Sequence, residues 1–142
     1  MMNFAKFAFA VSISLAALAS TARADDTLWQ DMGGVDAIKK IASDTTDNFL
    51  ADPRIKATFD NTNMDRFRIL LGDQFCAVAG GPCQYTGRTM KETHKGLHLG
   101  NADFNAVVED LQKAMDKNGV PFATQNRFVA RLAPMQHDIV TK

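Results

Sequence analysis

The chain has 142 residues with 16 basic and 16 acidic side chains, so its formal net charge is zero. This length suits a single domain. No run of like charges exceeds two residues, which argues against the basic patch or stripe of a nucleic-acid-binding protein.

Residues 1–24 have the three parts of a secretory signal peptide. Lys6 gives a weakly positive start, residues 7–18 form an apolar run of 12 residues, and a small-x-small cleavage site ends at Ala24. The run is too short to span a bilayer, which takes roughly 20 apolar residues, although an uncleaved membrane anchor is the alternative. We therefore expect an exported protein, periplasmic or secreted, whose mature domain covers residues 25–142 and has no membrane segment.

The mature chain is predicted to begin with two helices. Residues 25–31 form a truncated first helix that turns Leu28 and Trp29 toward the core, and the glycine pair at 33–34 ends it. Apolar side chains at helical spacing then predict a second helix over residues 35–51.

A short helix and a long helix follow. Pro53 is expected in the first turn of the short helix, which ends near Phe59, because proline lacks an N–H that would be unpaired there anyway. Asn63 can cap the long helix, and the glycine pair at 80–81 ends it. The apolar stripe of the long helix contains Met64, Phe67, Leu71, Phe75 and Val78.

The next helix is short and presents a single histidine. Thr89 opens it, and Glu92 completes a capping-box pattern. Met90, His94 and Leu97 are spaced i, i+4 and i+7, so they are predicted to share one face. A lone imidazole on an apolar face suits a metal or a flat apolar cofactor, and it suits a core histidine equally well.

Two further helices complete an all-α pattern. Asn101 is expected to cap the first of them, and the Asn118-Gly119 pair before Pro121 ends it. Pro134 is expected to kink the last helix or to fray one of its hydrogen bonds. The apolar side chains of these two helices are Phe104, Val107, Val108, Leu111 and Met115, and then Phe122, Val129, Leu132 and Ile139.

Cys76 and Cys83 are the two cysteines of the chain. In an exported domain an even number of cysteines indicates a disulfide, because such bonds persist in oxidising compartments. Two free thiols, one of them packed as a small hydrophobe, are the alternative. Neither cysteine lies in a C-x-x-C-H motif, so covalent c-type haem attachment is not indicated.

Several motifs resemble those of the group I truncated haemoglobins in order and spacing. They are Leu50-Ala51-Asp52-Pro53-Arg54-Ile55, Phe59, Asn61-Thr62-Asn63-Met64, Gly80-Gly81-Pro82-x-x-Tyr85-Thr86-Gly87 and Met90-Lys91-x-x-His94-x-Gly96. The resemblance runs from about residue 28 to residue 140. It implies an all-α fold, a truncated globin-like two-on-two helical sandwich around haem b.

The resemblance also implies roles for individual residues. The family histidine that matches His94 is the proximal ligand of the haem iron, and neutral imidazole suits iron. The phenylalanine that matches Phe59 packs on the porphyrin face, and Tyr85 can reach a haem propionate. The other expected walls of the haem site, each of which also suits an ordinary core position, are Phe67, Leu71, Phe75, Met90, Leu97 and Val108.

The distal ligand pocket departs from the family pattern. Truncated haemoglobins of this group usually place a tyrosine and a glutamine there, and both donate hydrogen bonds to bound oxygen. The matching positions here are Thr46 and Leu71, with Phe67 at the gate of the pocket. We therefore expect an apolar distal pocket. The other two histidines, His98 and His137, are expected to lie outside the site.

The first functional hypothesis is a haem-b protein that reversibly binds oxygen or another diatomic gas, such as NO or CO, in the periplasm. An alternative is a redox enzyme, such as a nitric oxide dioxygenase or a peroxidase. It would need an external electron donor, because no flavin or nicotinamide motif occurs in the chain. A haem carrier without gas chemistry is the third hypothesis.

Overall fold

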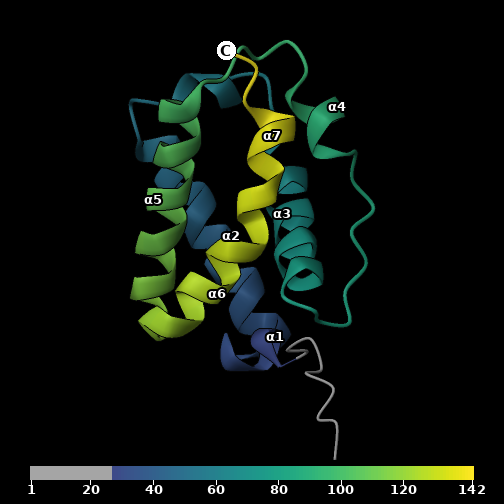
Figure 1. Cartoon of the computed structure of the whole chain (residues 1–142), viewed down its shortest axis with the longest axis vertical. Coiled ribbons are helices and arrows are strands. Elements are labelled where there is room, and N and C mark those ends of the chain that lie inside the picture. Colours follow the sequence, from purple (N-terminus) through teal and green to yellow (C-terminus); the bar gives the residue numbers. More distant parts are fainter. Residues whose placement is uncertain (1–26) are drawn as a thin grey trace, which may run out of the picture.

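The structure is a computed structural model, and it describes residues 27–142. This part of the chain is helical and contains no β-strand, which confirms the all-α prediction (Figure 1). The α-helices are α1 (Leu28–Asp31), α2 (Gly34–Ala51), α3 (Met64–Val78), α4 (Met90–His94), α5 (Asn101–Lys117), α6 (Phe122–Leu132) and α7 (Gln136–Ile139). Two 3-10 helices, η1 (Lys56–Phe59) and η2 (Ala133–Met135), lie between them.

The expected signal peptide and its cleavage site lie outside the described residues. Within residues 27–142, no helix has the length and apolar character needed to cross a membrane.

The longer helices form two layers. Figure 1 shows α5 and the α6–α7 arm in front of α2 and α3, with α4 beside the upper end of α7. Helix α2 packs against both α3 and α5, and α6 contacts α3 and α5. The main core lies between these helices, and its largest buried side chains include Leu28, Ile38, Ile41, Met115 and Phe128.

The predicted boundaries of α2 and α3 and the predicted end of α1 are confirmed, while the expected start of the first helix at residue 25 lies outside the described residues. The break at the glycine pair lies between α1 and α2, with Gly33 as the N-cap and Gly34 as the first residue of α2. Asn63 caps α3 by accepting a hydrogen bond from the Arg66 N–H at 3.0 Å. Leu28 is fully buried and Trp29 packs against the core, also as predicted.

The prediction for Pro53 is wrong. The residue lies in a turn before η1 rather than in the first turn of a helix. The cause is the Asp52 side chain, which accepts from the Arg54 N–H at 2.9 Å and from the Arg54 guanidinium at 2.6–3.0 Å. These bonds hold the pKa of Asp52 at about 2, below its ordinary value.

One prediction for the C-terminal helices also needs correction. Gly100, not Asn101, caps α5, because the Asp103 carboxylate accepts from the Gly100 N–H at 2.8 Å while the Asn101 side chain accepts from Gln136. Phe122 lies on α6 as predicted, with 72% of its surface exposed, and Phe128 is the buried aromatic residue of this helix.

The last predicted helix is divided where the sequence places its proline. Pro134 lies in the 3-10 helix η2, which separates α6 from α7. Proline cannot donate the backbone hydrogen bond that a continuous α-helix requires. The last helix is therefore interrupted at its proline by a change of helix type.

Cys76 and Cys83 form the predicted disulfide, with their Cα atoms 5.7 Å apart. The bond ties α3 to the loop that leads into α4. Gly81 lies against it so closely that a Cβ atom there would come within 2.8 Å of the Cys76 sulfur. The loop therefore needs a residue without a side chain at this point.

Candidate functional site

His94 is the last residue of α4, and its imidazole is oriented by its own helix. Its Nδ1 lies 2.7 Å from the Met90 carbonyl oxygen. Because a carbonyl only accepts hydrogen bonds, Nδ1 must carry a proton, and in a neutral ring Nε2 then keeps a free lone pair. This backbone contact is the one that typically orients a metal-binding histidine.

The predicted capping box that positions this helix is present. The Thr89 hydroxyl accepts from the Glu92 N–H at 3.2 Å, and the Glu92 carboxylate accepts from the Thr89 N–H at 3.0 Å. The Thr89 hydroxyl also donates to the Glu92 carboxylate at 2.8 Å, and this bond, together with the one from the Thr89 N–H, holds the pKa of the Glu92 carboxyl below its ordinary value. A helix of five residues has little stability of its own, so the capping box helps to fix the backbone that carries His94.

The prediction that Leu97 shares a helical face with Met90 and His94 is wrong. Helix α4 ends at His94, Gly96 adopts a positive φ of 82°, and Leu97 lies beyond the turn with 42% of its surface exposed. The left-handed conformation, which glycine tolerates, ends the helical spacing before position 97. The role of Leu97 as a wall of a haem site stays a prediction.

Three phenylalanine rings form an aromatic cluster between α2, η1 and α3. Phe59 stacks on Phe49 with ring centroids 5.5 Å apart, and it meets the edge of Phe67 at 5.4 Å. Leu71 is half-buried and packs against both this cluster and the main core. The structure thus brings together three of the predicted site residues, Phe59, Phe67 and Leu71.

Thr46 is fully buried on α2, and its hydroxyl is already hydrogen-bonded within the helix. It donates to the Ala42 carbonyl at 2.8 Å, and the neighbouring Thr45 hydroxyl donates to the Ile41 carbonyl at 2.7 Å. A hydroxyl has one proton to donate. Neither threonine therefore offers a hydrogen to a ligand unless it first breaks its bond to the helix.

Gln74 is a polar residue near the site that the sequence analysis missed. Its amide donates to the Met90 sulfur at 3.1 Å and lies 3.8 Å from the Met135 sulfur. It follows Phe67 and Leu71 by seven and three residues, so it lies on their face of α3. Helical spacing could have found it, but a search for apolar side chains alone passes over an amide.

The remaining predicted site residues have ordinary contacts. Phe75 is buried and meets the Phe128 ring edge-on at 5.3 Å, and Val108 is half-buried on α5. The Tyr85 hydroxyl donates to the Arg88 carbonyl at 2.8 Å, and burial raises the pKa of Tyr85. Its proton is therefore used within the loop, and its predicted contact with a propionate stays a prediction.

His98 and His137 are both exposed, so the structure places neither among the buried site residues. Within the described part of the chain, no group of three or more His, Cys, Asp or Glu side chains could hold a metal ion. A single imidazole is insufficient to hold a metal by itself, but it suits iron whose other ligands come from a porphyrin. The residues present therefore fit a haem better than a metal ion with protein ligands alone.

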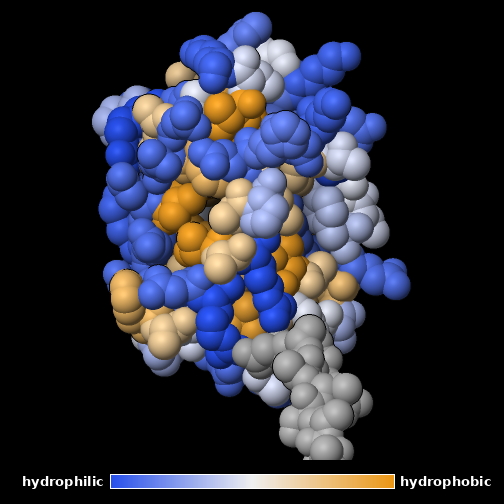
Figure 2. Space-filling model, in the orientation of Figure 1, coloured by the Kyte–Doolittle hydropathy of each residue, from blue (hydrophilic) through white to orange (hydrophobic). Residues whose placement is uncertain are grey.

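Hydrophobic side chains gather around a hollow between α5 and α7 on the face seen in Figure 2, and hydrophilic residues surround them. An apolar patch with a polar rim is typical of a ligand groove or an interface. The face with α5 and α7 therefore offers apolar surface next to the helices that carry the predicted site residues.

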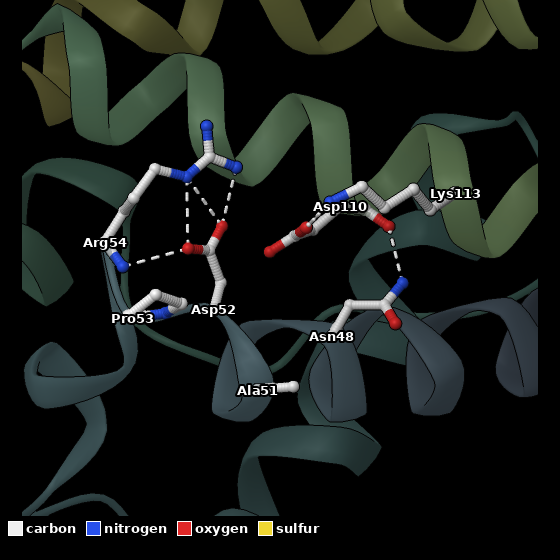
Figure 3. A pocket seen from close by; sticks show the side chains of 7 residues that line it. All are labelled: Asn48, Ala51, Asp52, Pro53, Arg54, Asp110 and Lys113. Carbon is white, nitrogen blue, oxygen red and sulfur yellow. Dashed lines mark hydrogen bonds and ion pairs between the residues drawn. The ribbon is translucent and has the colours of Figure 1, made fainter.

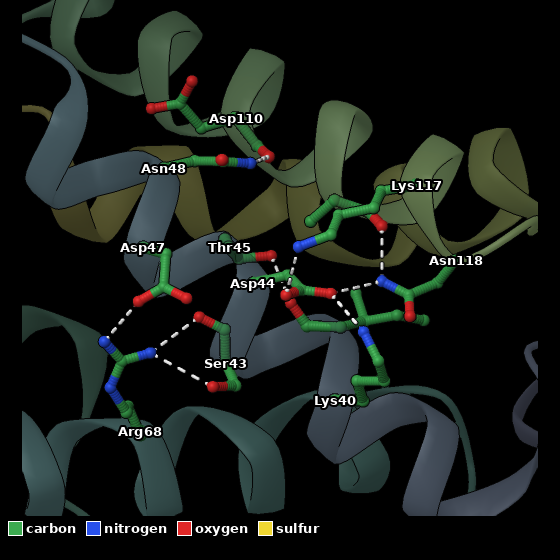
Figure 4. A network of polar contacts seen from close by, with 12 residues as sticks. Lys40, Ser43, Asp44, Thr45, Asp47, Asn48, Arg68, Asp110, Lys117 and Asn118 are labelled. Atoms are coloured by element: carbon green, nitrogen blue, oxygen red, sulfur yellow. Dashed lines mark hydrogen bonds and ion pairs between the residues drawn. The ribbon is translucent and has the colours of Figure 1, made fainter.

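Two polar features lie away from these residues. Asp44 on α2 accepts from Lys40, Lys117 and Asn118 at 2.7–2.8 Å, which ties α2 to the end of α5 (Figure 4). These partners, Lys117 first, hold the pKa of the Asp44 carboxyl well below its ordinary value. The second feature is a cleft beside Asp110, shown in Figure 3.

Comparison with known proteins gives consistent results. Residues 27–141 match the family described as bacterial-like globin. A group 1 truncated haemoglobin of Tetrahymena pyriformis is 33% identical over 82% of this chain and 96% of its own length. A group 1 truncated haemoglobin of Mycolicibacterium paratuberculosis is 30% identical over 81% of this chain and 85% of its own.

The structure of the ferric T. pyriformis protein superposes with a TM-score of 0.79 at 32% identity, covering 81% of this chain and 98% of that one. Three more structures of that protein carry substitutions at one tyrosine and at two glutamines, 21 and 25 residues after it. Phe67 and Leu71 follow Thr46 by the same 21 and 25 residues.

Proposed function

The chain belongs to the group 1 truncated haemoglobins of the bacterial-like globin family, and from this membership we propose that it holds a haem b through His94 and reversibly binds a diatomic gas. When bound, the haem iron supplies the open coordination position at which O₂, NO or CO binds. The observation that carries the proposal is the 2.7 Å contact between His94 Nδ1 and the Met90 carbonyl, which leaves Nε2 free for iron.

The apolar side chains of the site would hold the flat ring and exclude water. Phe59 and Phe67 contribute aromatic surface from the cluster beside α2, and Leu71 extends that surface along α3. We propose the same role for Phe75, Met90, Leu97 and Val108. Gln74, whose amide contacts Met90, joins the face of α3 that would meet the ring.

On the distal side we propose a pocket that lacks a strong side-chain donor. Thr46, Phe67 and Leu71 reproduce the spacing of the tyrosine and the two glutamines substituted in the T. pyriformis structures. None of the three supplies a free hydrogen, since Thr46 donates to its own helix and the other two are hydrocarbons. The pocket should therefore stabilise a polar ligand such as oxygen weakly.

We also propose export to the periplasm or the exterior, with cleavage after Ala24. The Cys76–Cys83 disulfide supports this proposal, because such bonds form and persist in oxidising compartments. An external electron donor would be needed there to return oxidised iron to the ferrous state.

The test is the substitution His94→Ala, with His98→Ala and His137→Ala as matched controls. The absorption and resonance Raman spectra of the purified ferric, ferrous and carbonyl forms report haem content and axial ligation. We expect His94→Ala to lose stable haem, or to regain a five-coordinate spectrum only with added imidazole, while both controls keep the wild-type spectra. A wild-type haem spectrum in His94→Ala would overturn the assignment.

A further inference from the structure

A cleft of about 400 Å³ lies between the end of α2, the turn that follows it and α5 (Figure 3). This volume is in the range of small-molecule sites. Its lining residues are Asn48, Ala51, Asp52, Pro53, Arg54, Asp110 and Lys113. None of them belongs to the proposed haem site, so the proposed gas chemistry does not account for the cleft.

Asp110 is the residue that sets the chemistry of this cleft. Only 1% of its surface is exposed, yet it is an aspartate in the middle of α5. One carboxylate oxygen, Oδ1, accepts from Lys113 Nζ at 2.8 Å. The other, Oδ2, is buried and has no hydrogen-bond partner among the described residues. Buried carboxylate oxygens normally accept a hydrogen bond, so Oδ2 lacks a donor.

The nearby arginine does not supply that donor. Figure 3 shows the Asp110 carboxylate directed toward the side of the cleft where Asp52 and Arg54 lie. The Arg54 guanidinium, however, makes three hydrogen bonds to Asp52, at 2.6–3.0 Å, and a fourth to Glu109 at 2.7 Å. Both oxygens of Asp52 are thereby occupied, while the buried Asp110 Oδ2 has no donor among the described residues.

The charge around the cleft favours a cation. The lining residues are balanced, with the carboxylates of Asp52 and Asp110 against the cations of Arg54 and Lys113. Glu109, which pairs with Arg54 but does not line the cleft, adds one formal negative charge. A metal ion is a poor match, because no metal-binding group of three or more His, Cys, Asp or Glu occurs within residues 27–142. An N–H donor with a positive charge satisfies both the free oxygen and the charge balance.

We propose that this cleft binds a small primary alkylammonium ion, whose N–H groups donate to Asp110 Oδ2 while its alkyl part lies against Ala51 and Pro53. The bond would be a charge-assisted hydrogen bond in a sheltered position, which is stronger than the same bond in water. Lys113 competes for the same carboxylate through Oδ1. Removing the Asp110 carboxylate should therefore weaken binding of the alkylammonium ion, and removing the Lys113 ammonium should strengthen it.

The proposal is tested by NMR titration of the purified, ¹⁵N-labelled protein with ethylammonium chloride at constant ionic strength. Tetramethylammonium chloride is the control ion, because it has the same charge and no N–H donor. We expect saturable shifts of the backbone amides of Ala51, Arg54 and the residues around Asp110 with ethylammonium only. Linear shifts without saturation, or equal binding of the two ions, would overturn the proposal.

Three variants complete the test. Asp110→Asn should weaken ethylammonium binding at least tenfold, Lys113→Met should tighten it severalfold, and Asp36→Asn, at an exposed carboxylate of α2, should leave it unchanged. Unchanged affinity in Asp110→Asn would overturn the proposal. If that variant does not fold, Lys113→Met decides: tighter binding supports the site, and equal or weaker binding rejects it.

Discussion

At the scale of single residues, function depends on where each hydrogen of a polar group is used. His94 and Thr46 both bond to a backbone carbonyl four residues earlier, at 2.7 and 2.8 Å. For the imidazole this bond leaves the second nitrogen free, but for the hydroxyl it uses the only proton. The same local contact therefore prepares one residue to bind a metal and prevents the other from donating to a ligand.

Asp44 gives a stability prediction at this scale. Its pKa is lowered in the folded state, so its contribution to stability is present above the unfolded pKa of roughly 3.9 and is lost as pH falls toward the folded value. Asp44→Asn should lower the free energy of unfolding by about 1–2 kcal/mol at pH 7, since it removes charged hydrogen bonds whose lysines are solvated.

The measurement is urea unfolding of wild type and Asp44→Asn between pH 7 and pH 2. We expect the difference in unfolding free energy to shrink as pH falls below about 4. Asp36→Asn serves as the control, because Asp36 is exposed on the same helix. A difference that stays constant with pH would show that the ionised Asp44 carboxylate does not stabilise the fold.

At the scale of elements, caps and glycines were predictable because they act over a few neighbouring residues. The Thr89–Glu92 box and the Asn63 cap needed only a local pattern, and both are present. Gly100 took the expected place of Asn101 because Gln136, far along the chain, uses the asparagine side chain. A competition of that kind depends on tertiary structure, which a local pattern does not contain.

In the candidate site, too, local patterns were predictable and features that depend on tertiary structure were not. The predicted common face of Met90, His94 and Leu97 assumed that the helix continues through Gly96, but the backbone turns there. The buried Asp110 and the amide of Gln74 were missed because both are polar, whereas the helical spacing was searched for apolar side chains. His94 and Phe59 were singled out because the motifs around them resemble the family pattern, and their roles at the haem stay predictions.

The disulfide supplies a prediction at this scale. It closes a loop of eight residues between Cys76 and Cys83, for which the chain-entropy model gives about 2.5 kcal/mol before any strain. Cys76→Ala with Cys83→Ala should lower the unfolding free energy by up to this amount. It should also speed haem loss, because the loop leading to α4 is no longer tied to α3.

Two measurements check this prediction. Mass spectrometry of unreduced protein should show the loss of two hydrogens relative to the reduced chain. Urea unfolding and transfer of haem to an apo-acceptor should then compare the double variant with wild type. Two thiols that react with an alkylating reagent before reduction would contradict the bridge, and equal rates of haem loss would show that the loop does not support His94.

At the scale of the whole molecule, the residues proposed for the haem site come from distant parts of the sequence. Helix α2 carries Thr46, α3 carries Phe67 and Leu71, and α4 carries His94. The fold class was predictable, since apolar spacing and chain breaks specify the helices and the family motifs specify their arrangement. The sequence could not predict which polar groups of the proposed pocket have a hydrogen free to donate to a ligand, because this depends on side-chain contacts such as the bond from Thr46 to the Ala42 carbonyl.

The proposed gas site is held by His94, and its distal side lacks a strong hydrogen-bond donor. Oxygen held in such a site carries partial negative charge, and a hydrogen bond to a charged group is worth about 1.5–3 kcal/mol, roughly tenfold to more than a hundredfold in affinity. Carbon monoxide is less polar and gains little from the same bond. The wild-type protein should therefore release oxygen quickly, oxidise readily and prefer carbon monoxide.

Stopped-flow measurement of the oxygen dissociation rate, in wild type and in Thr46→Tyr with Leu71→Gln, tests this claim most directly. The double variant restores the donors usual in the family, and we expect its oxygen dissociation to be at least tenfold slower, with the dissociation of carbon monoxide nearly unchanged. A wild-type protein that already releases oxygen as slowly as the double variant would contradict the account, because some other donor would then reach the ligand.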